Sequence, residues 1–233
     1  MPRDGPLGWG WPGHTIRLST TLYRYLVVGG HFFDGLSVHT YALHAARHTG
    51  VLAGEADALN NLGRIYRQQG HYRQAADHLQ QALTLARELG DRVGEAYVLL
   101  ALGTVYRREG HYRQAADHHE QALALFREVD HPHGEAYALN RVGETLLGIR
   151  QRDQAHAHHT AALTLASQIG ASYEQARAHS GLAHTHQAGG DLDQARHHWH
   201  QALDAYIHLG VPDVNDVRTC LNALDQAADN ESR

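Results

Sequence analysis

The chain repeats itself every 40 residues, and this period constrains its fold more than any other feature. Residues 54–93 align without gaps on residues 94–133, with identical residues at 23 of 40 positions. The same register continues through 134–173 and 174–213, and it extends back to a more divergent unit at 14–53. Repeats of this length stack on their neighbours to bury a continuous core. We therefore expect five successive structural units.

Each unit carries the pattern of two amphipathic helices. In the second unit, apolar residues recur at three- and four-residue spacing over residues 56–66 and again over residues 72–86. Small residues stand where the paired helices must approach closely. They are Gly63, Gly103, Gly143 and Ala183 in the first helices, and Ala75, Ala115, Ala155 and Ala195 in the second.

Glycine marks the turn between the two helices in four of the units, at Gly30, Gly70, Gly110 and Gly190. A helix that ends in a left-handed residue favours glycine there, because glycine has no Cβ to clash. The fourth unit has Arg150 at this place. We expect its turn to be strained or differently shaped.

These residues carry a resemblance to a known family. The succession Leu102-Gly103, Tyr106, Gly110-His111-Tyr112, Ala115, His119 and Ala122 resembles the tetratricopeptide repeat (TPR). The resemblance implies an all-α fold, a right-handed superhelix or α-solenoid of about five helix-turn-helix units (14–53, 54–93, 94–133, 134–173 and 174–213). A flexible segment, 1–13, would precede the units, and a polar capping helix with a tail, 214–233, would close the stack. The 40-residue period is similar to the variant in kinesin light chains.

A narrower resemblance lies at the two ends of the repeats. The segments GWPGHTIRLSTTLYRYL and DQARHHWHQALDAYIHLGVPD look like parts of the C-terminal TPR tail of large SARP-type (NB-ARC/TPR) transcriptional regulators of actinobacteria. Without lysine the chain has no phosphate-binding loop of the form GxxxxGK, so the nucleotide switch of those regulators is not implied. The resemblance implies only the sensing or assembly role of the tail.

Composition and charge exclude several classes of function. The formal net charge is −5 and the arginines are interspersed with Asp and Glu, which argues against direct nucleic-acid binding. The single cysteine, Cys220, can form neither an intramolecular disulfide nor a multi-cysteine zinc site. No stretch resembles a signal peptide or a membrane span. We expect a cytoplasmic protein that does not bind membranes.

Catalytic patterns are missing from the sequence. No serine stands in a strand-turn-helix context, and Cys220 falls in the expected capping helix. Glu55, Glu95 and Glu135 are first-turn residues that suit the helix dipole. We therefore predict no catalytic residue, no cofactor and no enzymatic activity.

The TPR resemblance also implies a binding groove, because the first helix of each TPR lines the concave surface. The inward positions are Asn60, Asn61, Arg64, Arg67, Gln68, Leu100, Thr104, Arg107, Arg108, Asn140, Arg141, Glu144, Ser180 and His184. Asparagine can hydrogen-bond an extended backbone, and guanidinium groups suit carboxylates. We predict a protein or peptide partner of acidic character, with Arg67 and Arg107 as exposed surface contacts. The alternative is that these arginines are solvated charges on a helix surface and bind no partner.

Histidine is abundant, with 22 residues, and it suggests a second hypothesis, a histidine-rich metal-binding repeat protein. Three pairs have helical spacing that lets two imidazoles share a metal: His44 with His48, His156 with His159, and His197 with His200. A further column recurs at one repeat position, at His78, His118, His158 and His198. Neighbouring repeats hold these about 8 to 10 Å apart, too far for one metal. We predict packing roles and no metal site.

Overall fold

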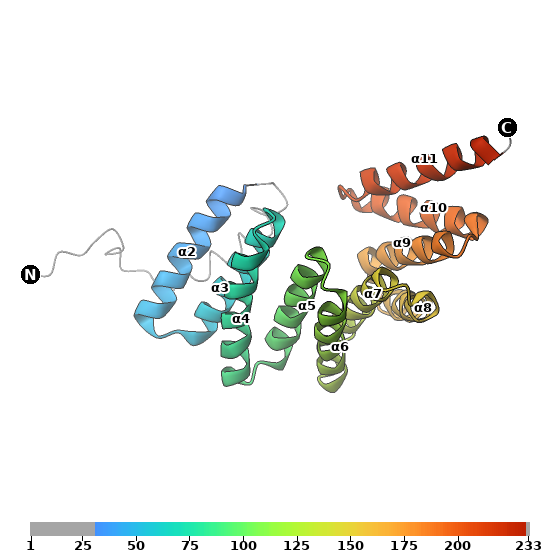
Figure 1. Cartoon of the computed structure of the whole chain (residues 1–233). Helices are drawn as coiled ribbons and strands as arrows, with labels where there is room; N and C mark the ends of the chain where they lie inside the picture. The colour runs from blue at the N-terminus through green and yellow to red at the C-terminus, as the bar shows by residue number, and fades with distance from the viewer. Residues whose placement is uncertain (1–30, 232–233) are drawn as a thin grey trace, which may run out of the picture. The chain divides into compact units, whose positions relative to one another are not determined.

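The computed structural model describes residues 31–231, and in these residues it contains ten α-helices and no strand (Figure 1). The helices are α2 (Phe32–Thr49), α3 (Leu52–Gln68), α4 (Tyr72–Leu89), α5 (Arg92–Arg108), α6 (Tyr112–Glu128), α7 (Pro132–Gly148), α8 (Arg152–Gln168), α9 (Ser172–Ala188), α10 (Leu192–Leu209) and α11 (Val214–Glu231). The all-α prediction is confirmed. The expected segment 1–13, the first helix of unit 14–53, Gly30 and residues 232–233 lie outside the described residues.

The helices fall into two compact units, residues 1–111 and residues 112–233. In the first unit α2, α3, α4 and α5 pack each on the next, and in the second α6 to α11 do the same. We call α3, α5, α7 and α9, which begin their repeats, the A helices, and α2, α4, α6, α8 and α10 the B helices. Successive A helices also touch within each unit, α3 with α5 and α7 with α9. Each unit thus exposes a continuous A-helix face.

Small residues let the paired helices approach, as the sequence predicts. The four B-helix alanines are completely buried: Ala75, Ala115, Ala155 and Ala195. On α3, a Cβ added to Gly63 would lie 2.6 Å from Cγ of Leu79 and 3.0 Å from the carbonyl oxygen of Ala75. Any larger residue at this position would push α3 away from α4.

The turns between A and B helices share one backbone conformation. Gly70, Gly110 and Gly190 have φ angles of +80°, +83° and +81°, in the left-handed region. Arg150 adopts the same region with φ +63°, although an L side chain is disfavoured there by about 1 kcal/mol. The strain predicted for this turn is therefore confirmed, while the turn keeps its handedness.

A recurring ion pair joins three of the B helices to the A helices that follow them. Nε of Arg47, Arg87 and Arg127 lies 2.7 Å from Oε1 of, respectively, Glu55, Glu95 and Glu135. The three glutamates stand in the first turns of their helices, as the sequence indicates, but each also bonds an arginine eight residues earlier. The last junction lacks the pair, and there Nε2 of Gln175 donates to the carbonyl of Ala166 at 3.0 Å.

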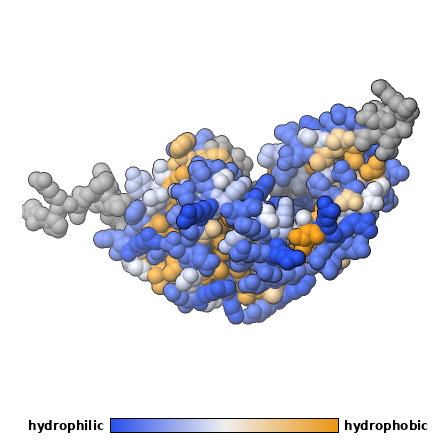
Figure 2. Space-filling model, viewed as in Figure 1, coloured by the Kyte–Doolittle hydropathy of each residue, from blue (hydrophilic) through white to orange (hydrophobic). Residues whose placement is uncertain are grey.

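Helix α11 covers the open face of the last repeat. Val217, Leu221 and Leu224 are buried against a cluster that includes Ala202 and Tyr206 of α10. Leu209, the last residue of α10, remains 36% exposed, and the chain turns at Gly210 immediately after it. None of the described helices is both long and apolar enough to cross a membrane, and hydrophilic residues dominate the face seen in Figure 2.

Candidate partner-binding site

The structure sorts the predicted groove positions of the first unit by exposure. Two are exposed, Gln68 and Arg108, and four are half-buried, Asn60, Arg64, Arg67 and Arg107. The other three, Asn61, Leu100 and Thr104, are 7%, 1% and 3% exposed. The hydroxyl of Thr104 donates to the carbonyl of Leu100 at 2.8 Å. The three buried residues lie beneath the A-helix face, so only the remaining six are accessible at its surface.

Arg67 and Arg107 occupy equivalent positions on α3 and α5, and the sequence treats them as surface residues. In the structure both are half-buried, and the Nε atom of each is shielded from solvent. Their stems are packed against the wall. Charge reversal at these two positions would therefore bury a carboxylate and cost more stability than the surface placement implies.

In the second unit, Asn140 is completely buried on α7. Its Nδ2 donates to the backbone carbonyl of Glu174 at 3.0 Å and to Oε2 of the same residue at 2.9 Å. Its Oδ1 lies 3.2 Å from Nδ1 of His159 on α8. The amide of Asn140 is thus committed to joining three helices and does not face a partner. Among the other predicted positions, Ser180 is half-buried and His184 is exposed.

His159 itself sits between two glycines. A Cβ at Gly143 of α7 would lie 2.6 Å from Nε2 of His159, and one at Gly181 of α9 would strike the same ring. Burial is the main cause that lowers the pKa of His159 to about 4, so the ring is neutral at physiological pH. This imidazole is a core group that locks two A helices onto one B helix.

A network of charged side chains covers the A-helix face of the second unit. Glu144 accepts hydrogen bonds from Arg141 at 3.0 Å and from Nε of Arg177 at 2.8 Å. Both guanidinium carbons lie 5.1 Å from the ring centre of Tyr137, within cation–π range. Glu174 adds a longer contact of 3.9 Å to Arg177. The sequence identifies Arg141 and Glu144 but misses Tyr137 and Arg177, which share one repeat position a turn earlier in their helices.

Positive and negative charges balance in this network. Arg177 is only 9% exposed, and burial alone would lower its pKa, but Glu144 and Glu174 outweigh this effect and raise it. Both arginines therefore stay charged beside two carboxylates. Arg141, which the sequence predicts as an anion-binding residue, is paired with Glu144 in the structure.

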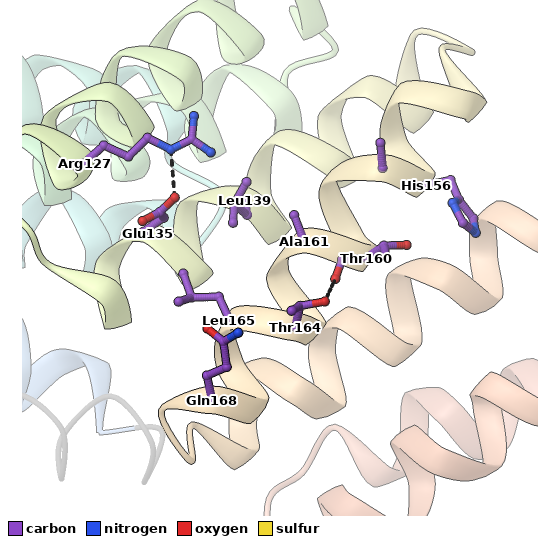
Figure 3. Close-up of a pocket in the computed structure, with 10 residues that line it drawn as sticks. Arg127, Glu135, Leu139, His156, Thr160, Ala161, Thr164, Leu165 and Gln168 are labelled. Carbon is purple, nitrogen blue, oxygen red and sulfur yellow. Dashed lines mark hydrogen bonds and ion pairs between the residues drawn. The ribbon is translucent and has the colours of Figure 1, made fainter.

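An open groove of about 580 Å³ lies on another face of the second unit, against α6, α7 and α8 (Figure 3). Small side chains of α8 form much of its wall, including Ala157, Ala161 and Thr164. The ion pair of Arg127 with Glu135 stands at one side of it, as Figure 3 shows. The sequence does not predict this groove. One of its small wall residues, Ala157, stands at a position that holds Asp77 and Asp117 in the second and third repeats.

The structure gives the histidines of the three pairs chosen for helical spacing different surroundings. His44, His48, His156, His197 and His200 are exposed, whereas His159 is buried in the core. Within residues 31–231, no three side chains of His, Cys, Asp or Glu are placed to hold a metal ion.

Comparison with known proteins agrees with the helix-pair architecture. The family model of the tetratricopeptide repeat matches residues 42–88 and 54–128. These two stretches include α3 to α6, so the match covers the central repeats of the chain. No curated protein matches the sequence.

Several solved structures share the fold over most of the chain. BtubC (BKLC) from P. vanneervenii superposes with a TM-score of 0.68 at 16% identity, covering 89% of this chain and 93% of that one. A kinesin light chain candidate from Podosopora anserina with nearly identical TPR-like repeats gives 0.66 at 15%, covering 86% and 98%. A Rap protein complexed with competence and sporulation factor gives 0.71 at 14%, covering 93% and 72%. At these identities the likeness establishes a TPR fold and leaves function to the site.

Proposed function

We propose that the chain is a protein- or peptide-binding TPR scaffold, without catalytic activity, whose partner carries an acidic segment. The observation that carries this proposal is the set of four arginines on the A-helix face of the first unit, which we call the arginine wall: Arg64, Arg67, Arg107 and Arg108. They lie on α3 and α5, which are in contact. Local positive charge on a chain of net charge −5 selects an acidic partner from its surroundings.

We do not place the acidic-segment site on the A-helix face of the second unit. Its own arginines, Arg141 and Arg177, are held by Glu144 at 3.0 and 2.8 Å and are therefore already neutralised. A carboxylate would have to displace Glu144 to bind there. We assign the network a structural role, because the pairing of Arg177 with Glu144 joins α9 to α7.

The proposal also includes the kind of protein in which this scaffold acts. The resemblance of both ends of the repeats to the tail of SARP-type regulators supports a role as the sensing or assembly tail, or a stand-alone relative, of a bacterial transcriptional regulator. The partner is then a protein segment in the cytoplasm, not a nucleic acid or a membrane. The Rap protein, solved in complex with competence and sporulation factor, supports partner binding by this architecture.

The proposal is tested by selecting a random peptide library on the immobilised chain and measuring the enriched peptides by fluorescence anisotropy. We expect peptides rich in Asp and Glu. A double variant in which glutamine replaces both Arg64 and Arg108 should bind these peptides at least about tenfold more weakly. The reason is that each charge-assisted contact contributes on the order of 1.5 to 3 kcal/mol when desolvated. Added salt should weaken binding in the same direction.

A matched control removes the same charge from another surface. Arg73 and Arg113 are exposed at the beginnings of α4 and α6, and their double glutamine variant should bind the peptides like the parent chain. Enrichment of basic or purely apolar peptides, or equal losses in the two double variants, would refute the arginine wall as the binding surface.

A further inference from the structure

The open groove on the second unit corresponds to a place that two side chains close in the first unit. There Arg47 of α2 donates from Nε to Glu55 of α3 at 2.7 Å, and from Nη2 to Oε1 of Gln81 on α4 at 3.2 Å. The amide of Gln81 is also held on its other side, because its Nε2 donates to the carbonyl of Asp77 at 3.1 Å. Arg47 and Gln81 thus join α2 to α4 across α3.

The groove keeps the arginine and the glutamate of this arrangement and lacks the glutamine. Nε of Arg127 donates to Oε1 of Glu135 at 2.7 Å, as in the first unit. The position of Gln81, however, is Ala161, one of the residues that line the groove. A methyl group offers no acceptor, and within residues 31–231 only Glu135 accepts a hydrogen bond from Arg127. The space of about 580 Å³ therefore stays open.

The rest of the groove is lined by small or uncharged side chains. On α8 they include Ala157, Thr160, Ala161 and Thr164, which are all exposed. The hydroxyl of Thr164 donates to the carbonyl of Thr160 at 2.9 Å and so bonds its own helix (Figure 3). A charged side chain of a partner would leave water for a lining whose only two charges pair with each other, which costs free energy. The groove therefore fits an uncharged surface.

The groove suits a helix better than an extended chain. Its lining on α8 runs from His156 to Gln168, a length of about 18 Å at the rise of an α-helix. An extended peptide commonly binds by pairing its backbone with the edge of a sheet, and the described residues contain no strand. A helix satisfies its own backbone and needs only side-chain contacts. About twelve residues of a partner helix would span the groove.

We propose that this groove binds a helix of a partner protein whose contacting face carries small apolar side chains and one glutamine or asparagine. The amide oxygen takes the place of that of Gln81 and accepts from the guanidinium of Arg127. An amide is preferred over a carboxylate, because Glu135 already neutralises Arg127. Ala157 and Ala161, one helical turn apart, let the two helix axes approach to about 8 to 10 Å. This surface shares no residue with the arginine wall and goes beyond the proposed function.

The test selects a phage library of helical peptides, about 14 residues long, on the immobilised full chain and measures the enriched peptides by fluorescence anisotropy. We expect uncharged faces of small apolar residues with a glutamine or asparagine. The decisive variant combines Ala157→Asp with Ala161→Gln, the residues of the second repeat at these exposed positions. It should keep the helicity and melting temperature of the parent and bind these peptides at least about tenfold more weakly, because its side chains fill the groove.

The control variant Gln201→Ala changes the equivalent exposed position of α10 and should bind the peptides like the parent. Replacing the glutamine or asparagine of a peptide with leucine should weaken its binding to the parent about fivefold, through loss of the hydrogen bond to Arg127. Acidic peptides bound by the arginine wall should bind the parent and the groove variant equally, which separates this proposal from the proposed function.

Three results would overturn the proposal of a helix-binding groove. They are enriched peptides that all bind the groove variant as tightly as the parent, an equal loss of affinity in the control variant, and groove-dependent peptides with central prolines, which do not form a regular helix. Should the double variant fail to fold, Ala161→Gln alone provides the same comparison, with a loss of affinity expected.

Discussion

The buried imidazole of His159 makes the stability of the chain depend on pH in a way that one substitution can isolate. Its ring is completely buried between Gly143 and Gly181, with its Nδ1 at 3.2 Å from Asn140. The change we choose is His159→Leu, because Leu79 fills the equivalent position on α4 and is also completely buried. The variant fills the buried position with an apolar side chain and removes the titrating imidazole.

The direction and size follow from the two states of the chain. The pKa of His159 falls from 6.5 to about 4 in the folded protein. Below pH 6.5 the unfolded chain takes up a proton that the folded chain refuses, so this contribution is complete above pH 6.5 and is lost progressively as the pH falls toward 4. From about pH 7.5 to about pH 5.5, the linkage relation gives a loss of about 1.3 kcal/mol from this residue.

The assay is urea unfolding followed by circular dichroism for parent and variant at both pH values. The drop in unfolding free energy on acidification should be smaller by about 1.3 kcal/mol in the His159→Leu variant, whatever the variant does to stability at neutral pH. Replacing the exposed His200 with leucine serves as the control and should leave the drop unchanged. An equal drop in parent and His159→Leu would refute a neutral, buried His159.

Two further predictions concern the ends of helices and of the stack. Arg150→Gly should raise the unfolding free energy by roughly 1 kcal/mol, because glycine adopts the left-handed conformation without a Cβ clash. The reverse change, Gly110→Arg, should lower the unfolding free energy. Urea midpoints that move in the opposite directions would show that the turn is unstrained. Removing the residues from 211 onward should uncover Ala202 and Tyr206 and cause self-association in light scattering; a truncated chain that stays monodisperse with unchanged thermal unfolding would contradict the capping role of α11.

The sequence predicts the helix pairs well because their determinants are local and recur. Period, apolar spacing and the turn glycines each repeat every 40 residues, so one unit reports on the others. The strain at Arg150 was predictable for the same reason, since three glycines define what the turn requires. The solvent exposure of Leu209 was less predictable, because it depends on where the chain turns after α10.

The candidate site was predicted less completely, because position on a helix face does not fix what a side chain contacts. Asn140 lies in the expected register, but Glu174 and His159 satisfy its amide from two other helices. Arg177 is linked to the network by Glu144, which lies 33 residues earlier in the chain. Such contacts arise between repeats, whereas the sequence pattern describes each repeat singly.

The ring of His159 has a consequence for the exchange of repeats. The space for this ring is left free by Gly143 of its own repeat and by Gly181 of the next repeat. The imidazole of the fourth repeat therefore requires a residue without a side chain in the fifth. In the third and second repeats the position of Gly181 holds Ala101 and Asn61, and neither would fit against this ring. The fourth and fifth repeats therefore form a matched pair, and recombination or design that shuffles repeats must move them together.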